Sequence, residues 1–334
     1  MRNKTATALV GAGVFALALG VLIPTVAAPR LIKAPGEIAL TTHSRSEAQK
    51  LNTTTQKLET VQVDLTRRLA THRIAGKVAG TDKNGVFDEL LELKLVNSDG
   101  TLSPSLGTDA QYNGLKAAAS VVAFDRKSGK GVPGFRGDTW NTTAQTVKFP
   151  FDAKKKTYSY FDQTSGRAFP VSYVRTTTVK GLKVYEYHGT IPQMSLGQYG
   201  VLAGTDTIYS NTGRTVLVEP VTGSIVSSTT SPQTSIQFPD GSVVPALLVK
   251  ELVPTDATVA ERVSYAKDKK SQIQLLQRAP WALVILGLLL LGGGLFVQMR
   301  RRPAQGAPAA RPDVSGALPT PRTEPAARPT HVKH

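Results

Sequence analysis

An uncharged stretch near the C-terminal end constrains this chain more than any other feature. No Asp, Glu, Lys or Arg occurs between Arg278 and Arg300. As a helix this stretch would extend about 32 Å at about 1.5 Å per residue, which matches the roughly 30 Å hydrocarbon core of a bilayer. Pro280 fits the first turn of such a helix, and Trp281 suits the headgroup level. The sequence therefore predicts a transmembrane helix over residues 280–299.

A second apolar stretch lies at the N-terminus. After the short basic segment 1–4, no charged residue occurs until Arg30. Two interpretations are open, a signal peptide cleaved after Ala28 or an uncleaved signal anchor. The apolar run is longer than the core of a usual signal peptide, and Pro29 fits poorly just after a cleavage site. We expect an uncleaved transmembrane anchor over residues 5–28.

Two spans place both ends of a chain on the same side of the membrane. A short basic segment before an apolar run is an export signal, so the middle of the chain is expected outside the cell membrane. The tail is rich in Pro, Ala and Arg, a composition typical of disorder. The expected two-pass organisation is a cytoplasmic N-terminus (1–4), a first span (5–28), an extracytoplasmic domain (29–279), a second span (280–299) and a disordered cytoplasmic tail (300–334).

The region between the spans carries mostly strand patterns. Apolar and polar residues alternate over 61–66 and again over 91–95, the period of a strand with one buried face. A hairpin is predicted where Phe149 and Phe151 lead into a polar turn and Tyr158 leads out of it. The predicted fold class is mainly β, a β-rich extracytoplasmic domain with a few helices between two transmembrane α-helices.

Two helices are expected beside these strands. The polar segment 44–58 is interpreted as a candidate helix. A second helix is expected to be capped by Thr255 or Asp256 and to run towards the second span. Its lysines would lie near lipid headgroups.

Composition excludes several kinds of chemistry. The net charge of +16 is spread along the chain without a nucleic-acid motif, which favours a surface beside anionic lipid over a nucleic-acid partner. The chain has no cysteine, and none of its five histidines has a second ligand at metal spacing. No nucleotide-binding or serine-hydrolase motif occurs. We therefore expect no catalytic residue, no metal and no cofactor, and a protein that is not an enzyme.

Aromatic residues concentrate in the part of the chain with the most strand patterns. Ordinary sheet packing explains such a concentration, and the wall of an apolar pocket is the functional alternative. Both interpretations stay open from the sequence. The candidate ligand-binding residues are Phe149, Phe151, Tyr158, Tyr160, Phe161, Tyr173, Tyr185 and Tyr187.

Several short segments resemble an actinobacterial family. They are the stretch from Ala123 to Arg126, the stretch from Phe149 to Asp152, and the stretch from Glu219 to Gly223. Together with the two apolar stretches they are similar to the porin PorA family, described mainly as a domain of unknown function. The resemblance covers all but the tail. It implies a two-span membrane protein with an extracytoplasmic domain and supplies no catalytic residue.

The expected arrangement is also similar to that of class B scavenger receptors. These lipid-binding proteins place a large, tunnelled, β-rich domain between two membrane spans. They contain cysteines that this chain lacks, and the likeness concerns topology alone.

Three functional hypotheses follow. The leading hypothesis is that the β-rich domain binds or transfers a lipid or another hydrophobic ligand at the outer membrane face, which a continuous apolar tunnel would support. The second is a scaffold or adhesion module for other envelope proteins, which a solid core with one exposed apolar patch would support. The third is an oligomeric porin-like channel. The expected partners are the lipid bilayer, a hydrophobic ligand and envelope proteins, with no nucleic acid.

Overall fold

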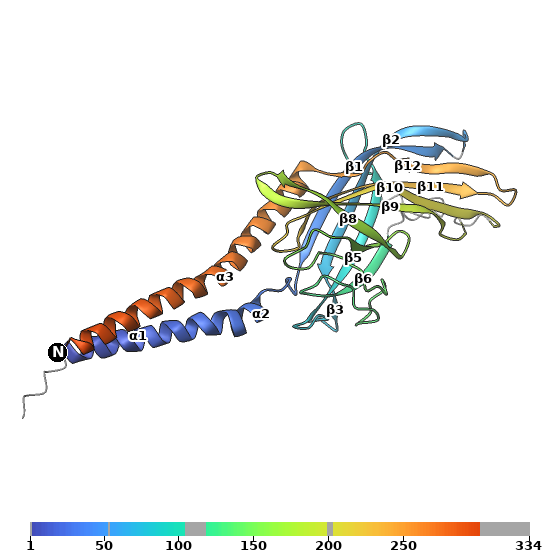
Figure 1. Cartoon of the computed structure of the whole chain (residues 1–334). Coiled ribbons are helices and arrows are strands. Elements are labelled where there is room, and N and C mark those ends of the chain that lie inside the picture. The colour runs from blue at the N-terminus through green and yellow to red at the C-terminus, as the bar shows by residue number, and fades with distance from the viewer. Residues whose placement is uncertain (1, 53, 104–117, 199–202, 301–334) are drawn as a thin grey trace, which may run out of the picture. The chain divides into compact units, whose positions relative to one another are not determined.

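The computed structural model describes residues 2–52, 54–103, 118–198 and 203–300, so the predicted disordered tail lies almost wholly outside the described residues. An eleven-stranded antiparallel sheet dominates the structure (Figure 1). Its strands are β1 (Ala39–Asn52), β2 (Lys57–Thr71), β5 (Asn84–Leu95), β6 (Ala118–Asp125), β7 (Tyr158–Asp162), β8 (Arg167–Val179), β9 (Leu182–Ser195), β10 (Asp206–Val218), β11 (Ile225–Gln237), β12 (Val243–Val249) and β13 (Val253–Pro254).

The strand order is β6-β5-β2-β1-β12-β11-β10-β9-β8-β7, and β13 pairs with β1 beside this path. Two short strands, β3 (Arg73–Ile74) and β4 (Lys77–Val78), form a separate pair. The predicted alternation over 61–66 lies in β2, and the alternation over 91–95 lies in β5. The prediction of a mainly β fold with two apolar terminal helices is confirmed.

The interpretation of segment 44–58 as a candidate helix is wrong. Most of it lies in β1, which pairs with β2 from Ala39 to Asn52. Asn52 closes the hairpin, since its Oδ1 accepts hydrogen bonds from the following backbone N–H groups of Thr54 and Thr55. Exposed polar side chains of β1 alternate with the buried residues Ser46 and Ala48, and pairing with the neighbouring strands β2 and β12 decides the structure here.

The predicted aromatic hairpin has a different partner strand. β7 pairs with β8, from Tyr158 opposite Val171 to Asp162 opposite Arg167. The residues before β7 are irregular, because the backbone N–H of Phe149 donates to the carbonyl of Gly223 and so docks on a distant turn. The hairpin turn is therefore 163–166 rather than the lysine-rich segment 152–156.

The outer strands β6 and β7 are connected by isolated bridges through an irregular segment. Phe124 of β6 pairs with Gly131, Lys130 pairs with Gln145, and Gln145 pairs with Tyr160 of β7. These bridges give backbone partners to strands that would otherwise be edges. The curled sheet thereby encloses an interior, as a barrel does.

The N-terminal helical stretch consists of α1 (Arg2–Leu22), a π-helix (Ile23–Ala27) that contains Pro24, and α2 (Ala28–Leu31). The C-terminal helix α3 (Asp256–Met299) begins as predicted, with the Thr258 N–H donating to the Thr255 hydroxyl. Pro280 lies inside α3 and does not start a separate helix. Lys4–Leu31 and α3 are long and apolar enough to span a membrane.

Glycines allow α1 and α3 to approach closely within each of two compact units. The first unit consists of Met1–Phe15 and Leu286–His334, and the second is Ala16–Ile285. In the first unit, a Cβ on Gly13 would lie 2.9 Å from the Gly287 carbonyl oxygen, and one on Gly294 would lie 2.7 Å from Val10. In the second, a Cβ on Gly20 would lie 2.7 Å from Val284. Small residues of this kind are typical of packed transmembrane helices.

Candidate functional site

Two neighbouring cavities lie in the unit Ala16–Ile285. Each has a volume of about 520 Å³, within the range of small-molecule sites. Three residues line both cavities, Arg67 on β2, Ile225 on β11 and Arg262 on α3. The cavities therefore share a wall, and we name them the polar cavity and the apolar cavity after the side chains described below.

The apolar cavity lies between the sheet and α3. Leucine, isoleucine and phenylalanine side chains from the sheet line one side, including Leu40, Leu69 and Phe87. The other side is lined by Ile273 and Leu276 of α3, by Leu31 at the end of α2 and by Ile32 just after it. Leu31 ends the first candidate span, and Leu276 lies four positions before Pro280. The apolar cavity thus adjoins the residues that lead into both spans.

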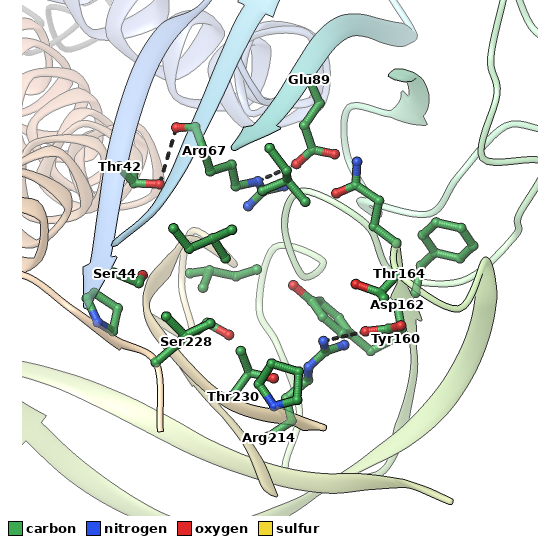
Figure 2. Close-up of a pocket in the computed structure, with 18 of the residues that line it drawn as sticks. Thr42, Ser44, Arg67, Glu89, Tyr160, Asp162, Thr164, Arg214, Ser228 and Thr230 are labelled. Carbon is green, nitrogen blue, oxygen red and sulfur yellow. Dashed lines mark hydrogen bonds and ion pairs between the residues drawn. The ribbon is translucent and has the colours of Figure 1, made fainter. Parts of the chain in front are cut away.

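The polar cavity contains two ion pairs, one between the neighbouring strands β2 and β5 and one between the separated strands β7 and β10 (Figure 2). Arg67 on β2 pairs with Glu89 on β5. Arg214 on β10 pairs with Asp162 on β7, with 2.5 Å between Nη2 and Oδ2. The Tyr160 ring lies beside the second pair, 5.6 Å from the guanidinium carbon of Arg214. Charged groups from four strands therefore face one interior space.

Strand alternation turns these charged side chains inward. Arg67 lies in the same phase of β2 as Leu65 and Leu69, which face the interior. Glu89 lies in the same phase of β5 as the buried residues Phe87 and Leu93. A charged residue in phase with an apolar row was a signal available in the sequence, and our sequence interpretation missed it for both members of this ion pair.

Burial and neighbouring charges oppose each other in setting the pKa values around the Arg214–Asp162 pair. Burial lowers the pKa of the Arg214 guanidinium, but the Asp162 carboxylate and two neighbouring tyrosines together raise it further, so the pKa ends above its ordinary value. Burial and the Asp162 charge raise the pKa of Tyr209. Its hydroxyl stays protonated at neutral pH and donates to Asp162 Oδ2 at 3.4 Å. Asp162 therefore accepts from both Arg214 and Tyr209 at this side of the polar cavity.

Two oxygen atoms in the wall of the polar cavity are buried without a protein hydrogen-bond partner among the described residues. They are Glu89 Oε2 and Thr207 Oγ1. Since buried polar atoms are usually hydrogen-bonded, these atoms are available to a polar group inside the cavity.

Arg262 occupies the shared wall without a carboxylate partner. Its Nη1 donates to the carbonyl oxygen of Ile225 at 3.1 Å, the one hydrogen bond of its side chain within the described part of the chain. Burial, and then the positive charge of Arg67, lower its pKa to about 10. The guanidinium is still charged at neutral pH and keeps donors free for a further acceptor.

The eight aromatic candidates fall into different environments. Phe149, Tyr158 and Tyr187 are buried in a solid aromatic cluster, with 5.0 Å between the ring centroids of Phe149 and Tyr187. Tyr173 and Tyr185 pack against this cluster. The cavities are lined by the other three candidates, Tyr160 and Phe161 in the polar cavity and Phe151 in the apolar cavity.

The arrangement suits an amphiphile better than a purely apolar molecule. The apolar cavity offers side chains that can bury hydrocarbon, and the shared wall offers guanidinium donors. No group of three or more His, Cys, Asp and Glu side chains within the described residues is placed to hold a metal ion.

Comparison with known proteins places this architecture in a family. A family model described as Porin PorA matches residues 5–296, which include nearly all of both candidate spans and the whole sheet. A protein named Porin PorA from Corynebacterium amycolatum is 45% identical over 49 residues. That match covers 15% of this chain and 13% of the relative, so the chain aligns with only a small part of the relative's length.

Proposed function

The chain belongs to the Porin PorA family, and from this membership we propose that its β-rich domain binds or transfers an amphiphilic lipid at the outer face of the cell membrane. The two apolar helices and the family indicate a membrane or envelope location. The family also favours an envelope protein or channel over an enzyme. The two-pass topology, with both chain ends in the cytoplasm, is part of the proposal.

The observation that carries the proposal is the position of the apolar cavity. It adjoins Leu31 and Leu276, which lead into the two candidate spans, and it ends at a wall that contains Arg67 and Arg262. Burying one CH₂ group contributes about 0.8 kcal/mol, so ten would contribute about 8 kcal/mol before the costs of association. A cavity of this kind can therefore hold an acyl chain taken from the adjoining leaflet.

A tryptophan in the polar cavity supplies a direct binding assay. The chain has two tryptophans, so Trp281→Phe leaves Trp140 alone. Trp140 lines the polar cavity and stacks on Phe161 at 4.7 Å between ring centroids. We expect a doxyl-labelled stearic acid to quench Trp140 saturably in the detergent-solubilised full chain, and native mass spectrometry to detect co-purified lipid. No quenching together with no bound lipid would reject the proposal.

The proposed topology can be tested separately. The chain has no cysteine, so a single Thr41→Cys on the exposed face of β1 gives one reactive thiol. A membrane-impermeant maleimide should label this thiol in intact cells. Labelling only after lysis would place the β-rich domain in the cytoplasm.

A porin-like channel is the second candidate, and the Porin PorA family model favours it. Two helices in one chain cannot enclose a water-filled pore, so a channel requires several chains. It predicts discrete conductance steps in planar bilayers and their loss in Gly294→Leu. Lipid binding without conductance would support the leading proposal over this one.

A further inference from the structure

The guanidinium of Arg262 differs from the other arginines of the cavities in its surroundings. Arg67 and Arg214 each have a carboxylate partner, whereas no carboxylate of the described residues lies within ion-pair distance of Arg262. Its helical neighbour Glu261 is exposed, and adjacent helix positions do not face each other. A partly buried guanidinium beside two cavities is therefore left without an ion-pair partner among the described residues, although the negative charge of Glu261 opposes part of the fall in its pKa.

The cavity walls as a whole carry an excess of positive charge. In the polar cavity, Glu89 pairs with Arg67 and Asp162 pairs with Arg214. Arg262 is the cationic lining residue that has no acidic partner there among the described residues. The apolar cavity adds more cations than anions: its remaining charged lining residues are Lys33, Lys148, Lys269 and Glu261. Lys33 pairs with Asp82, which does not line the cavity. Lys148 donates to the backbone carbonyl of Lys127, and Lys269 donates to the side-chain amide oxygen of Gln272.

We propose that the ligand has an acidic headgroup, a carboxylate or a phosphate, and that Arg262 binds this headgroup while the acyl chain lies in the apolar cavity. The inference rests on the proposed lipid-binding function and specifies the chemistry of its ligand. A guanidinium offers planar, paired N–H donors that match the two oxygens of a carboxylate or phosphate. Arg262 lines both cavities, so a headgroup bound there keeps its acyl chain within reach of Leu40 and Leu69.

The test compares an acid with its own ester. Doxyl-labelled stearic acid and its methyl ester share the same chain, so only the headgroup charge differs. Binding is measured by quenching of Trp140 in full-length Trp281→Phe protein, with unlabelled lysophosphatidic acid and inorganic phosphate as competitors. The variants are Arg262→Gln, Arg262→Lys and the control Arg175→Gln, which removes an exposed arginine paired with Glu186 at 2.8 Å.

We expect the unsubstituted protein to bind the acid at least about 10-fold more tightly than the ester. Arg262→Gln should weaken binding of the acid by about 10- to 100-fold and leave binding of the ester unchanged. Arg262→Lys should recover part of the loss because it restores the charge without the paired donors. Arg175→Gln should leave both affinities unchanged. Lysophosphatidic acid should compete, and inorganic phosphate should not.

Other results would overturn the inference in distinguishable ways. If the acid and the ester bind equally in both the unsubstituted protein and Arg262→Gln, the acidic headgroup is rejected while lipid binding stands. Competition by inorganic phosphate as strong as that by lysophosphatidic acid would identify a site for free anions instead. If neither acid nor ester binds, the proposed function itself fails. Unchanged ester binding shows that Arg262→Gln is folded, and Arg262→Lys provides a second folded variant.

Discussion

Arg214 and Asp162 form an ion pair with 2.5 Å between Nη2 and Oδ2, although 52 positions separate them in the chain. Asp162 ends β7 and also accepts a hydrogen bond from the Ser165 backbone N–H at 2.8 Å. Arg214 comes from β10, three strands further along the sheet. The pair therefore connects an outer strand of the curled sheet to its middle and helps to shape the polar cavity.

Removing the arginine of this pair should destabilise the fold. Arg214→Met leaves the nearly fully buried Asp162 carboxylate without its countercharge, and we expect a loss of about 3–5 kcal/mol in the free energy of unfolding. The double variant Asp162→Asn with Arg214→Met should lose less than the two single variants together. Urea denaturation of the solubilised chain measures both values. Arg175→Met, in an exposed pair, is the control, and an equal loss there would contradict the expectation.

Lys148 should make stability depend on pH. Burial lowers its pKa to about 7 from 10.5, with the Asp125 carboxylate opposing the shift. The unfolded chain therefore binds more protons than the folded protein between these two values, and the free energy of unfolding should rise with pH across this window. Below about pH 7, the pKa of Lys148 in the folded protein, the buried ammonium group destabilises the fold to its full extent.

Lys148→Met should remove this contribution. We expect the slope, at most about 1.4 kcal/mol per pH unit, to disappear from the variant between about pH 7 and about pH 10. The variant should also be more stable than the unsubstituted protein at about pH 6, by an amount on the order of a few kcal/mol. Urea denaturation across this range measures both effects. Identical slopes in the two proteins would show that the ammonium group is not desolvated.

Gly223 should tolerate no side chain. Its φ is +70°, and a Cβ there would lie 2.1 Å from the carbonyl oxygen of Phe149. We expect Gly223→Ala to lower the free energy of unfolding by about 2–4 kcal/mol, since it combines backbone strain with a steric clash. Gly241→Ala is the matched control, with a φ of +83° and no atom within 4 Å of the new Cβ. Similar losses in the two variants would show that the φ angle alone matters.

Filling the apolar cavity should prevent ligand binding. Leu40 lines this cavity, whereas Thr41 is exposed on the opposite face of the same strand. We expect Leu40→Trp to reduce retention of tritiated palmitate by the full chain at least about 10-fold, since the larger ring occupies the space of several CH₂ groups. Thr41→Trp should retain palmitate normally. Equal retention by the two variants, with unchanged melting temperatures, would exclude this cavity as the binding site.

The sequence by itself determined the elements that depend on local composition. Uninterrupted apolar runs predict the helices over Lys4–Leu31 and in the C-terminal half of α3, because membrane-spanning length and hydropathy are properties of a single segment. Alternation predicts strands such as β2 and β5, because a period of two follows from strand geometry. The start of α3 also follows from a local capping residue, Thr255.

Only the tertiary structure decided which strands pair and which charges meet. β1 is a strand because β2 and β12 supply hydrogen-bond partners on both sides, a condition that its own polar residues do not reveal. Arg67 and Glu89 lie in phase with apolar rows, so each was recognisable in the sequence as unusual, but their pairing depends on the register of two strands. Asp162 and Arg214 meet across 52 positions, and Arg262 reaches the shared wall from a helix. Side chains far apart in a sequence become neighbours only when long-range strand pairing closes the sheet, and that closure is a property of the whole chain.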